Sequence, residues 1–155
     1  MALQIGQPAP AFTLFNTEKK QISLSDYKGK NVVILFFPLA FTGVCTAELC
    51  NIRDNYNVYT SLNAVVLGIS VDSLFSLEKF KEEQHYNFDL LSDFNKTTCT
   101  AYEAIYADFV LGMKAVSKRA AFIVDASGII KYAEVLEDAG QQPNFDEIKA
   151  CLAKI

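Results

Sequence analysis

The sequence lacks several features that would assign it to large classes of proteins. None of its apolar runs approaches the roughly 20 residues that a membrane-spanning helix needs. It has no Cys-x-x-Cys pair, and its single histidine, His85, stands alone, so the spacing of a zinc site is missing. No internal repeat, low-complexity segment or linker divides the 155 residues. We therefore expect one domain, residues 1–155, without a membrane span or a metal site.

The charge and the N-terminal segment restrict the partners and the location. The net charge of -4 disfavours nucleic acids and anionic membranes as partners. Met1–Phe12 has neither the basic region nor the apolar core of a secretory signal. We expect a cytoplasmic protein, and in that reducing compartment its four cysteines are thiols rather than structural disulfides.

Strand-like and helix-like segments alternate along the chain. The expected strands are Ala11–Leu14, Gln21–Leu24, Val32–Phe37, Ala64–Val71, Phe88–Leu91, Arg119–Asp125 and Ile129–Val135. The expected helices are Gly43–Leu62, Ser73–Gln84, Thr97–Tyr106 and Phe145–Lys154. The two core strands Val32–Phe37 and Ala64–Val71, joined by a helix, should run parallel, and the last two strands should form an antiparallel hairpin. This order predicts an α/β fold of the thioredoxin-like kind, with a mixed central sheet flanked by helices and an N-terminal hairpin.

Cys45 occupies the most informative position in the chain. It follows the strand Val32–Phe37 and lies in the first turn of the next expected helix. Unpaired backbone N–H groups and the positive end of the helix dipole favour a thiolate at such a position. Thr42, Cys45 and Glu48 recur at every third residue, so they lie roughly along one helix face. The pattern predicts a cysteine nucleophile with a hydroxyl and a carboxylate beside it.

A thiolate there would need a cation nearby, and Arg119 is the preferred candidate. Its guanidinium stays charged and presents a planar fork of donors, which the neighbouring Lys118 does not. Pro38 should form a rigid bend after the strand. Cys99 and Cys151 are expected to be packing residues.

The motif Pro38-x-x-x-Thr42-x-x-Cys45, combined with the distant Arg119, resembles the peroxiredoxins, the alkyl hydroperoxide reductase/thiol-specific antioxidant family. Within that family, the segment Phe36–Gly43 is most similar to the E-type group of alkyl hydroperoxide reductases. The segment Cys45–Asn55 is also similar to the bacterioferritin-comigratory-protein (Q-type) group. The likeness covers nearly the whole chain.

The resemblance implies a cofactor-free thiol peroxidase that reduces hydrogen peroxide and organic hydroperoxides. Cys45 would be the peroxidatic thiolate, and Thr42 and Arg119 would hold the peroxide oxygens. Pro38 would shield the site, and Glu48 would orient Arg119. The likeness to the E-type group also implies a homodimer that associates near the active-site loops.

The resemblance further implies that Cys50 resolves the oxidised Cys45 and that thioredoxin recycles the enzyme. In an intact helix, five residues separate two side chains by about 7.5 Å along the axis and about 140° around it. A disulfide requires Cα atoms within about 6.8 Å, so Cys45 and Cys50 could bond only if the first helical turns unwind. One alternative is a one-cysteine peroxidase resolved by a low-molecular-weight thiol or glutaredoxin. Another is a thioredoxin-like redox sensor or holdase, which would not consume peroxide catalytically.

Overall fold

The computed structural model describes residues 3–155. The expected domain 1–155 and the segment Met1–Phe12 both include residues 1 and 2, which lie outside the described residues. The strands of the main sheet are β1 Thr13–Asn16, β2 Gln21–Ser23, β3 Asn31–Phe36, β4 Ala64–Ser70, β5 Asp89–Ser92, β8 Arg119–Val124 and β9 Ile130–Leu136. A second sheet holds β6 Ile105–Asp108 and β7 Lys114–Ser117. The α-helices are α1 Gly43–Asp54, α2 Tyr56–Ser61, α3 Leu74–Gln84, α4 Thr97–Ala101 and α5 Phe145–Lys154, with short 3-10 helices at Leu24–Tyr27 and Val110–Gly112.

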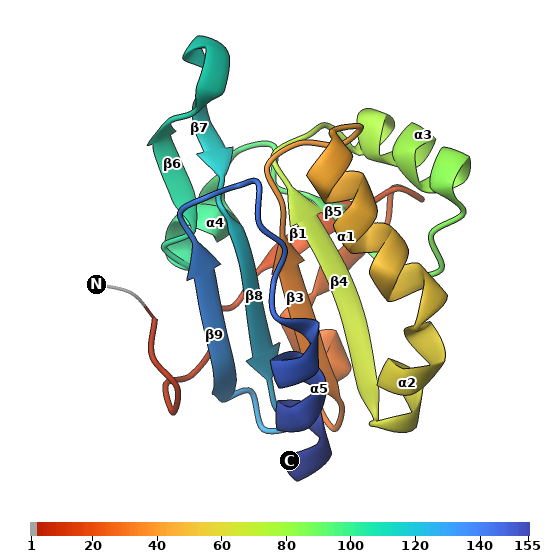
Figure 1. Cartoon of the computed structure of the whole chain (residues 1–155). Coiled ribbons are helices and arrows are strands. Elements are labelled where there is room, and N and C mark those ends of the chain that lie inside the picture. The colour runs from red at the N-terminus through yellow and green to blue at the C-terminus, as the bar shows by residue number, and fades with distance from the viewer. Residues whose placement is uncertain (1–2) are drawn as a thin grey trace.

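The main sheet has seven strands in the order β2-β1-β5-β4-β3-β8-β9 (Figure 1). The pairs β3/β4 and β4/β5 are parallel, whereas β3/β8 and β8/β9 are antiparallel. The predicted parallel core and closing antiparallel hairpin are therefore confirmed. In the turn of that hairpin Gly128 adopts a φ of +88°, a conformation that favours glycine.

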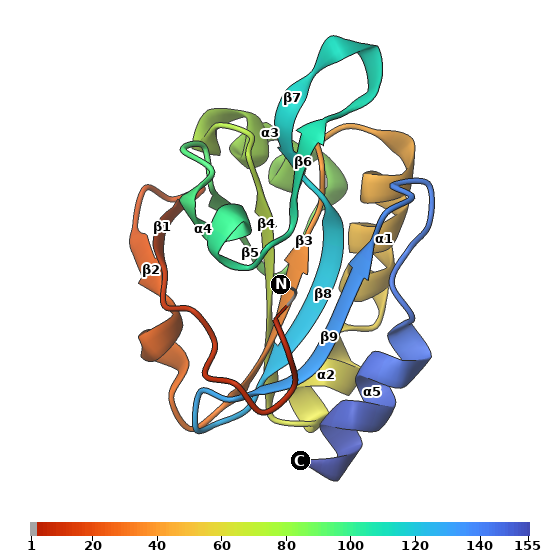
Figure 2. The same ribbon diagram turned by 90° about the vertical axis from the view of Figure 1, so that its left-hand side faces the viewer.

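The sheet separates two hydrophobic cores, and β3 contributes to both. All six residues of β3 are buried. Because side chains alternate along a strand, Val33 and Leu35 face the core under α1, α2, α3 and α5, and Ile34 and Phe36 face the core that includes α4. Figure 2 shows α1, α2 and α5 on one face of the sheet and α4 on the other.

Three predicted elements need correction. The single helix Gly43–Leu62 is interrupted at Asn55, whose φ of -117° and ψ of 16° end α1 before α2 begins. The predicted helix Thr97–Tyr106 ends at Ala101, because Glu103 has a positive φ and the chain then enters β6. The first strand begins at Thr13 rather than Ala11 and extends to Asn16, whose side chain accepts N–H groups from the following turn.

Two further features of residues 3–155 bear on function. No helix in this part of the chain combines the length and apolar character needed to cross a bilayer. The β6–β7 hairpin projects beyond the carboxyl end of β3, above the main sheet (Figure 1). Ligands of such sheets collect outside the carboxyl ends of the parallel strands, so this end is where a site is expected.

Candidate active site

Strand pairing brings Cys45 and Arg119 together across 74 residues of chain. β3 ends at Phe36, the buried Pro38 follows, and Cys45 is the third residue of α1. β8 runs antiparallel to β3, with Ala120 opposite Phe36. Arg119, the first residue of β8, therefore lies beside the carboxyl end of β3, where α1 starts.

The guanidinium of Arg119 is held by three groups. Its Nη2 donates to Cys45 Sγ at 3.2 Å. Its Nη1 donates to a carboxylate oxygen of Glu48. The carbonyl oxygen of Ala139, in the loop after β9, accepts from Nε at 3.2 Å and from Nη2 at 2.9 Å. Arg119 is only 2% exposed, so it is a buried cation in fixed contact with a buried thiol.

Glu48 pairs with Arg119 inside the protein. Burial raises the pKa of Glu48 to about 7, although Arg119 acts in the opposite direction. Burial alone would lower the pKa of Arg119, but Glu48 and Cys45 outweigh that effect and raise it. Removing one partner of such a buried pair typically costs about 3–5 kcal/mol, because the other is left uncompensated. Within residues 3–155, Glu48 Oε1 has no hydrogen-bond partner.

Thr42 and Pro38 come shortly before Cys45 in the chain, between the end of β3 and the start of α1. Thr42 is the N-cap of α1, but its hydroxyl accepts no N–H group of the helix and instead donates to the Leu39 carbonyl at 2.8 Å. The hydroxyl oxygen can therefore still accept a hydrogen bond from a ligand. Of the residues predicted to be catalytic, Cys45 and Glu48 both contact Arg119 directly. Thr42 lies in the same helical turn as Cys45. The sequence reasoning missed Ala139, because a backbone carbonyl has no signature in the side-chain sequence.

The other three cysteines have different surroundings, and none of the four forms a disulfide. Cys50 is half-buried on α1, and its thiol donates to Gln84 Oε1 at 3.6 Å. Cys99 is fully buried in the core on the α4 face, and Cys151 packs at the edge of the opposite core. These places agree with the packing role predicted for Cys99 and Cys151.

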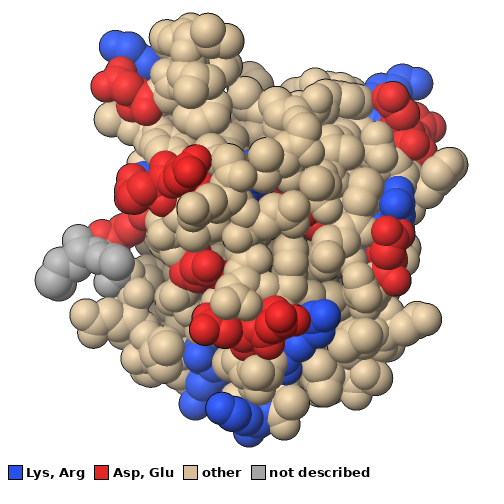
Figure 3. Space-filling view, viewed as in Figure 1, with Lys and Arg blue, Asp and Glu red and all other residues tan. Residues whose placement is uncertain are grey.

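Figure 3, viewed as in Figure 1, shows the acidic and basic side chains of this face in several separate groups, with acidic groups on the left and a mixed group below the centre. Residues 3–155 contain no group of three or more His, Cys, Asp or Glu side chains placed to hold a metal ion. The functional groups that meet at this site are a thiol, a guanidinium and a carboxyl, with the Thr42 hydroxyl at the start of the same helix.

A thiol held by an arginine at the start of a helix, on a thioredoxin-like sheet, defines the class of cysteine-dependent peroxidases. The AhpC/TSA family model matches residues 5–133, and the chain belongs to this family. It is a peroxiredoxin, a peroxidase that reduces a hydroperoxide with electrons from a thiol.

Similar proteins support this assignment along the whole chain. A relative from Coxiella burnetii named peroxiredoxin bcp is 38% identical over 131 residues, covering 84% of this chain and 87% of its own. The solved structure of peroxidoxin BcpB from Mycobacterium tuberculosis has a TM-score of 0.86 and 26% identity, covering 99% of this chain and 98% of that one. A peroxiredoxin-like protein from Aquifex aeolicus, at 24% identity, has a TM-score of 0.88 and covers 99% of this chain and 88% of its own, which supports the fold.

Proposed function

We propose that Cys45 is the peroxidatic cysteine of this peroxiredoxin. Its thiolate attacks one peroxide oxygen, so that an S–O bond forms while the O–O bond breaks. The leaving oxygen takes up a proton and departs as water or an alcohol, and Cys45 becomes a sulfenic acid. The observation that carries this assignment is the Arg119 N–H group 3.2 Å from the Cys45 sulfur in a buried site.

Ionising the thiol accounts for only part of the expected rate. A free cysteine is already about 3% thiolate at pH 7, so full ionisation gains at most about 30-fold, or roughly 2 kcal/mol. A fast peroxidase needs more, and the remainder must come from stabilising the charge that develops on the leaving oxygen. Arg119 has the donors for that task, and the Thr42 hydroxyl can accept the O–H of the incoming hydroperoxide.

Glu48 and Pro38 have supporting roles in this proposal. Glu48 accepts from Nη1 and leaves Nη2 directed at the sulfur, so it orients the guanidinium. Pro38 is buried between β3 and α1, where it helps to exclude water from the thiolate. Hydrogen peroxide and organic hydroperoxides are the proposed substrates.

We further propose that Cys50 resolves the sulfenic acid. The Cys50 thiolate attacks the Cys45 sulfur, so that an S–S bond forms while the S–O bond breaks, and the released hydroxide takes up a proton and leaves as water. Thioredoxin then reduces the disulfide. The position of Cys50 on the same helix, five residues after Cys45, supports this pairing, provided that the first turns of α1 open.

The remaining proposals concern organisation and location. One seven-stranded sheet that contains both β1 and β9, with β6 and β7 as a separate hairpin, supports one domain over residues 1–155. The exposed apolar side chains of Val110 and Leu111, at the tip of the β6–β7 hairpin, support a homodimer. Four free thiols support a cytoplasmic location.

Replacing Cys50 tests the proposed cycle. Cys50→Ser should leave the first peroxide reduction nearly unchanged, slow thioredoxin-linked turnover, and increase oxidation of Cys45 to the sulfinic acid. Cys151→Ser, which alters another half-buried thiol, is the control and should behave like the unmodified protein. If Cys50→Ser turns over normally with thioredoxin, Cys50 is not the resolving residue and the one-cysteine cycle replaces this proposal.

A further inference from the structure

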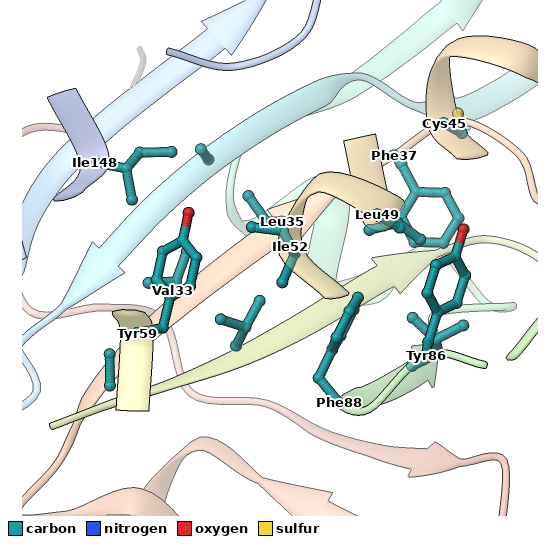
Figure 4. Packing of buried hydrophobic residues seen from close by; sticks show 14 of the residues in the cluster. Val33, Leu35, Phe37, Cys45, Leu49, Ile52, Tyr59, Tyr86, Phe88 and Ile148 are labelled. Carbon is teal, nitrogen blue, oxygen red and sulfur yellow. The ribbon is translucent and has the colours of Figure 1, made fainter. Parts of the chain in front are cut away.

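Tyr86 connects the segment after α3 to the first turns of α1. Its side chain is buried, and its ring packs against Phe80 and Phe88 with centroids 5.2 and 5.5 Å away. Its hydroxyl donates to the Thr46 carbonyl at 3.3 Å and lies 3.8 Å from Cys50 Sγ. In Figure 4 the hydroxyl of Tyr86 points toward the end of the core where Cys45 lies.

The carbonyl that Tyr86 holds lies between the two cysteines of the proposed disulfide. Thr46 follows Cys45 directly, and the α-helical pattern pairs its carbonyl with the N–H of Cys50. The sulfurs of Cys45 and Cys50 can meet only if this part of the helix unwinds. Unwinding moves the Thr46 carbonyl, so it must break the bond to Tyr86.

The C-terminal end of α1 is held in place by other contacts. The Arg53 side chain donates to the Gln84 carbonyl, and the Asn87 side chain donates to the Arg53 carbonyl at 3.3 Å. These contacts do not involve the residues between the two cysteines. The first two turns of α1 are held instead by the contacts of Cys45 and Glu48 with Arg119 and by the Tyr86 hydroxyl, and they can open while the rest of the helix stays docked.

Tyr86 remains a donor under physiological conditions. Burial raises the pKa of Tyr86 far above its usual value, and the contact with Cys50 adds to this effect. The positively charged Arg53 acts in the opposite direction but does not reverse it. The hydroxyl is therefore protonated at neutral pH and is available to bond the Thr46 carbonyl.

We propose that Tyr86 is a positioning residue whose hydroxyl holds the first turns of α1 closed and so sets the rate at which oxidised Cys45 reaches Cys50. This inference rests on the proposed resolving role of Cys50. A closed helix keeps the sulfenic acid beside Arg119, where a second peroxide can oxidise it further. An open helix allows the disulfide to form. Tyr86 would thereby set the balance between resolution and overoxidation.

The variant Tyr86→Phe tests this role, because it removes only the hydroxyl and keeps the packed ring. Loss of one hydrogen bond should raise the opening equilibrium by about three- to tenfold. Disulfide formation after a single peroxide addition should accelerate by the same factor, and the peroxide concentration that causes sulfinic acid formation should rise. The initial reaction with peroxide should be unchanged.

Tyr102→Phe is the matched control. Tyr102 is also buried, packs against Phe36 and Phe122, and donates to a backbone carbonyl, that of Pro10, at 2.7 Å on the other face of the sheet. It should lower stability without changing the resolution rate. Equal resolution rates in the unmodified protein and Tyr86→Phe, or an equal increase in Tyr102→Phe, would overturn the proposal.

Hydrogen exchange of the reduced protein separates this inference from the role of Cys50. Tyr86→Phe should accelerate exchange of the amides of residues 46–50, and Tyr102→Phe should not. If no Cys45–Cys50 disulfide forms in the unmodified protein, the resolving role fails, whereas faster exchange in Tyr86→Phe would still support the control of helix opening. Unchanged exchange would contradict that control whether or not the disulfide forms.

Discussion

Cys45 and Cys99 can be compared directly, because the two thiols have the same local position in different surroundings. Each is the third residue of a helix, Cys45 in α1 and Cys99 in α4. Each is buried, at 1% and 0% exposure. They lie in the two cores on opposite faces of the sheet. A rule based on helix position and burial alone would treat them as equivalent.

They differ in the sign of the neighbouring charge. The guanidinium of Arg119 donates to the sulfur of Cys45. The carboxylate of Asp93 lies beside Cys99 and accepts hydrogen bonds from the backbone N–H groups of Thr98 and Cys99 at 3.0 and 2.7 Å. Burial and the negative charge of Asp93 raise the pKa of Cys99 to about 12. We therefore expect the thiol at the start of α1, beside a cation, to be the reactive one, and the thiol at the start of α4, beside an acidic cap, to be inert.

Serine substitutions at the two positions should give the largest contrast. Cys45→Ser should abolish peroxide turnover while the fold is kept, because Cys45 is the thiol that receives the hydrogen bond from Arg119. Cys99→Ser should retain most of the activity. Peroxide consumption with a thiol regenerating system measures both. Substantial activity in Cys45→Ser would remove the basis for distinguishing the two thiols.

The charge and the donor geometry of Arg119 can be separated by Arg119→Lys. Lysine keeps the charge but loses the planar fork that contacts Cys45, Glu48 and Ala139 together. We expect the rate constant for peroxide reduction to fall by about 100-fold, the usual effect of removing one donor to a developing charge. Stopped-flow kinetics should show the loss even near pH 10, where a free thiol is fully ionised. An unchanged rate there would mean that Arg119 acts only by ionising the thiol.

The burial of Glu48 predicts a pH dependence of stability. With a pKa of about 7 in the folded protein against 4.5 as its ordinary value, Glu48 binds a proton in the folded state that the unfolded chain releases. Proton binding by Glu48 therefore adds to the free energy of unfolding below pH 4.5, and this stabilisation is lost as the pH rises through about 7. Relative to Glu48→Gln, the free energy of unfolding should fall by on the order of 3 kcal/mol over this interval. Denaturant titrations at several pH values measure the difference; a rise instead of a fall would show that the Arg119 ion pair outweighs desolvation.

The smallest effect is expected from Asp93→Asn. This change removes the negative charge beside Cys99 while an amide oxygen can still accept an N–H at the start of α4. Burial is the larger cause of the raised pKa of Cys99, so alkylation of Cys99 should accelerate only about two- to fivefold. Alkylation of Cys45 in the same sample provides the internal reference. An increase of 100-fold or more would assign the inertness of Cys99 to charge rather than burial.

Much of the fold and the site could be predicted from local sequence, and the failures have physical causes. The apolar run that forms β3 and the Pro38, Thr42 and Cys45 motif are local signals. The β6–β7 hairpin was missed because its two short strands gain stability from each other, and only the start of β6 overlaps a predicted element, the helix Thr97–Tyr106. Tyr86 was missed because its role depends on a contact with Thr46 across 40 residues of chain.

Peptide mapping after one equivalent of hydrogen peroxide tests the central claim most directly. The reduced protein should lose two hydrogen atoms in intact mass, and the digest should contain a Cys45–Cys50 disulfide with Cys99 still a free thiol. In Cys50→Ser, a sulfenic acid should be found at Cys45. Oxidation of Cys99 or Cys151 while Cys45 stays reduced would contradict the claim that Arg119 selects Cys45 as the peroxidatic residue.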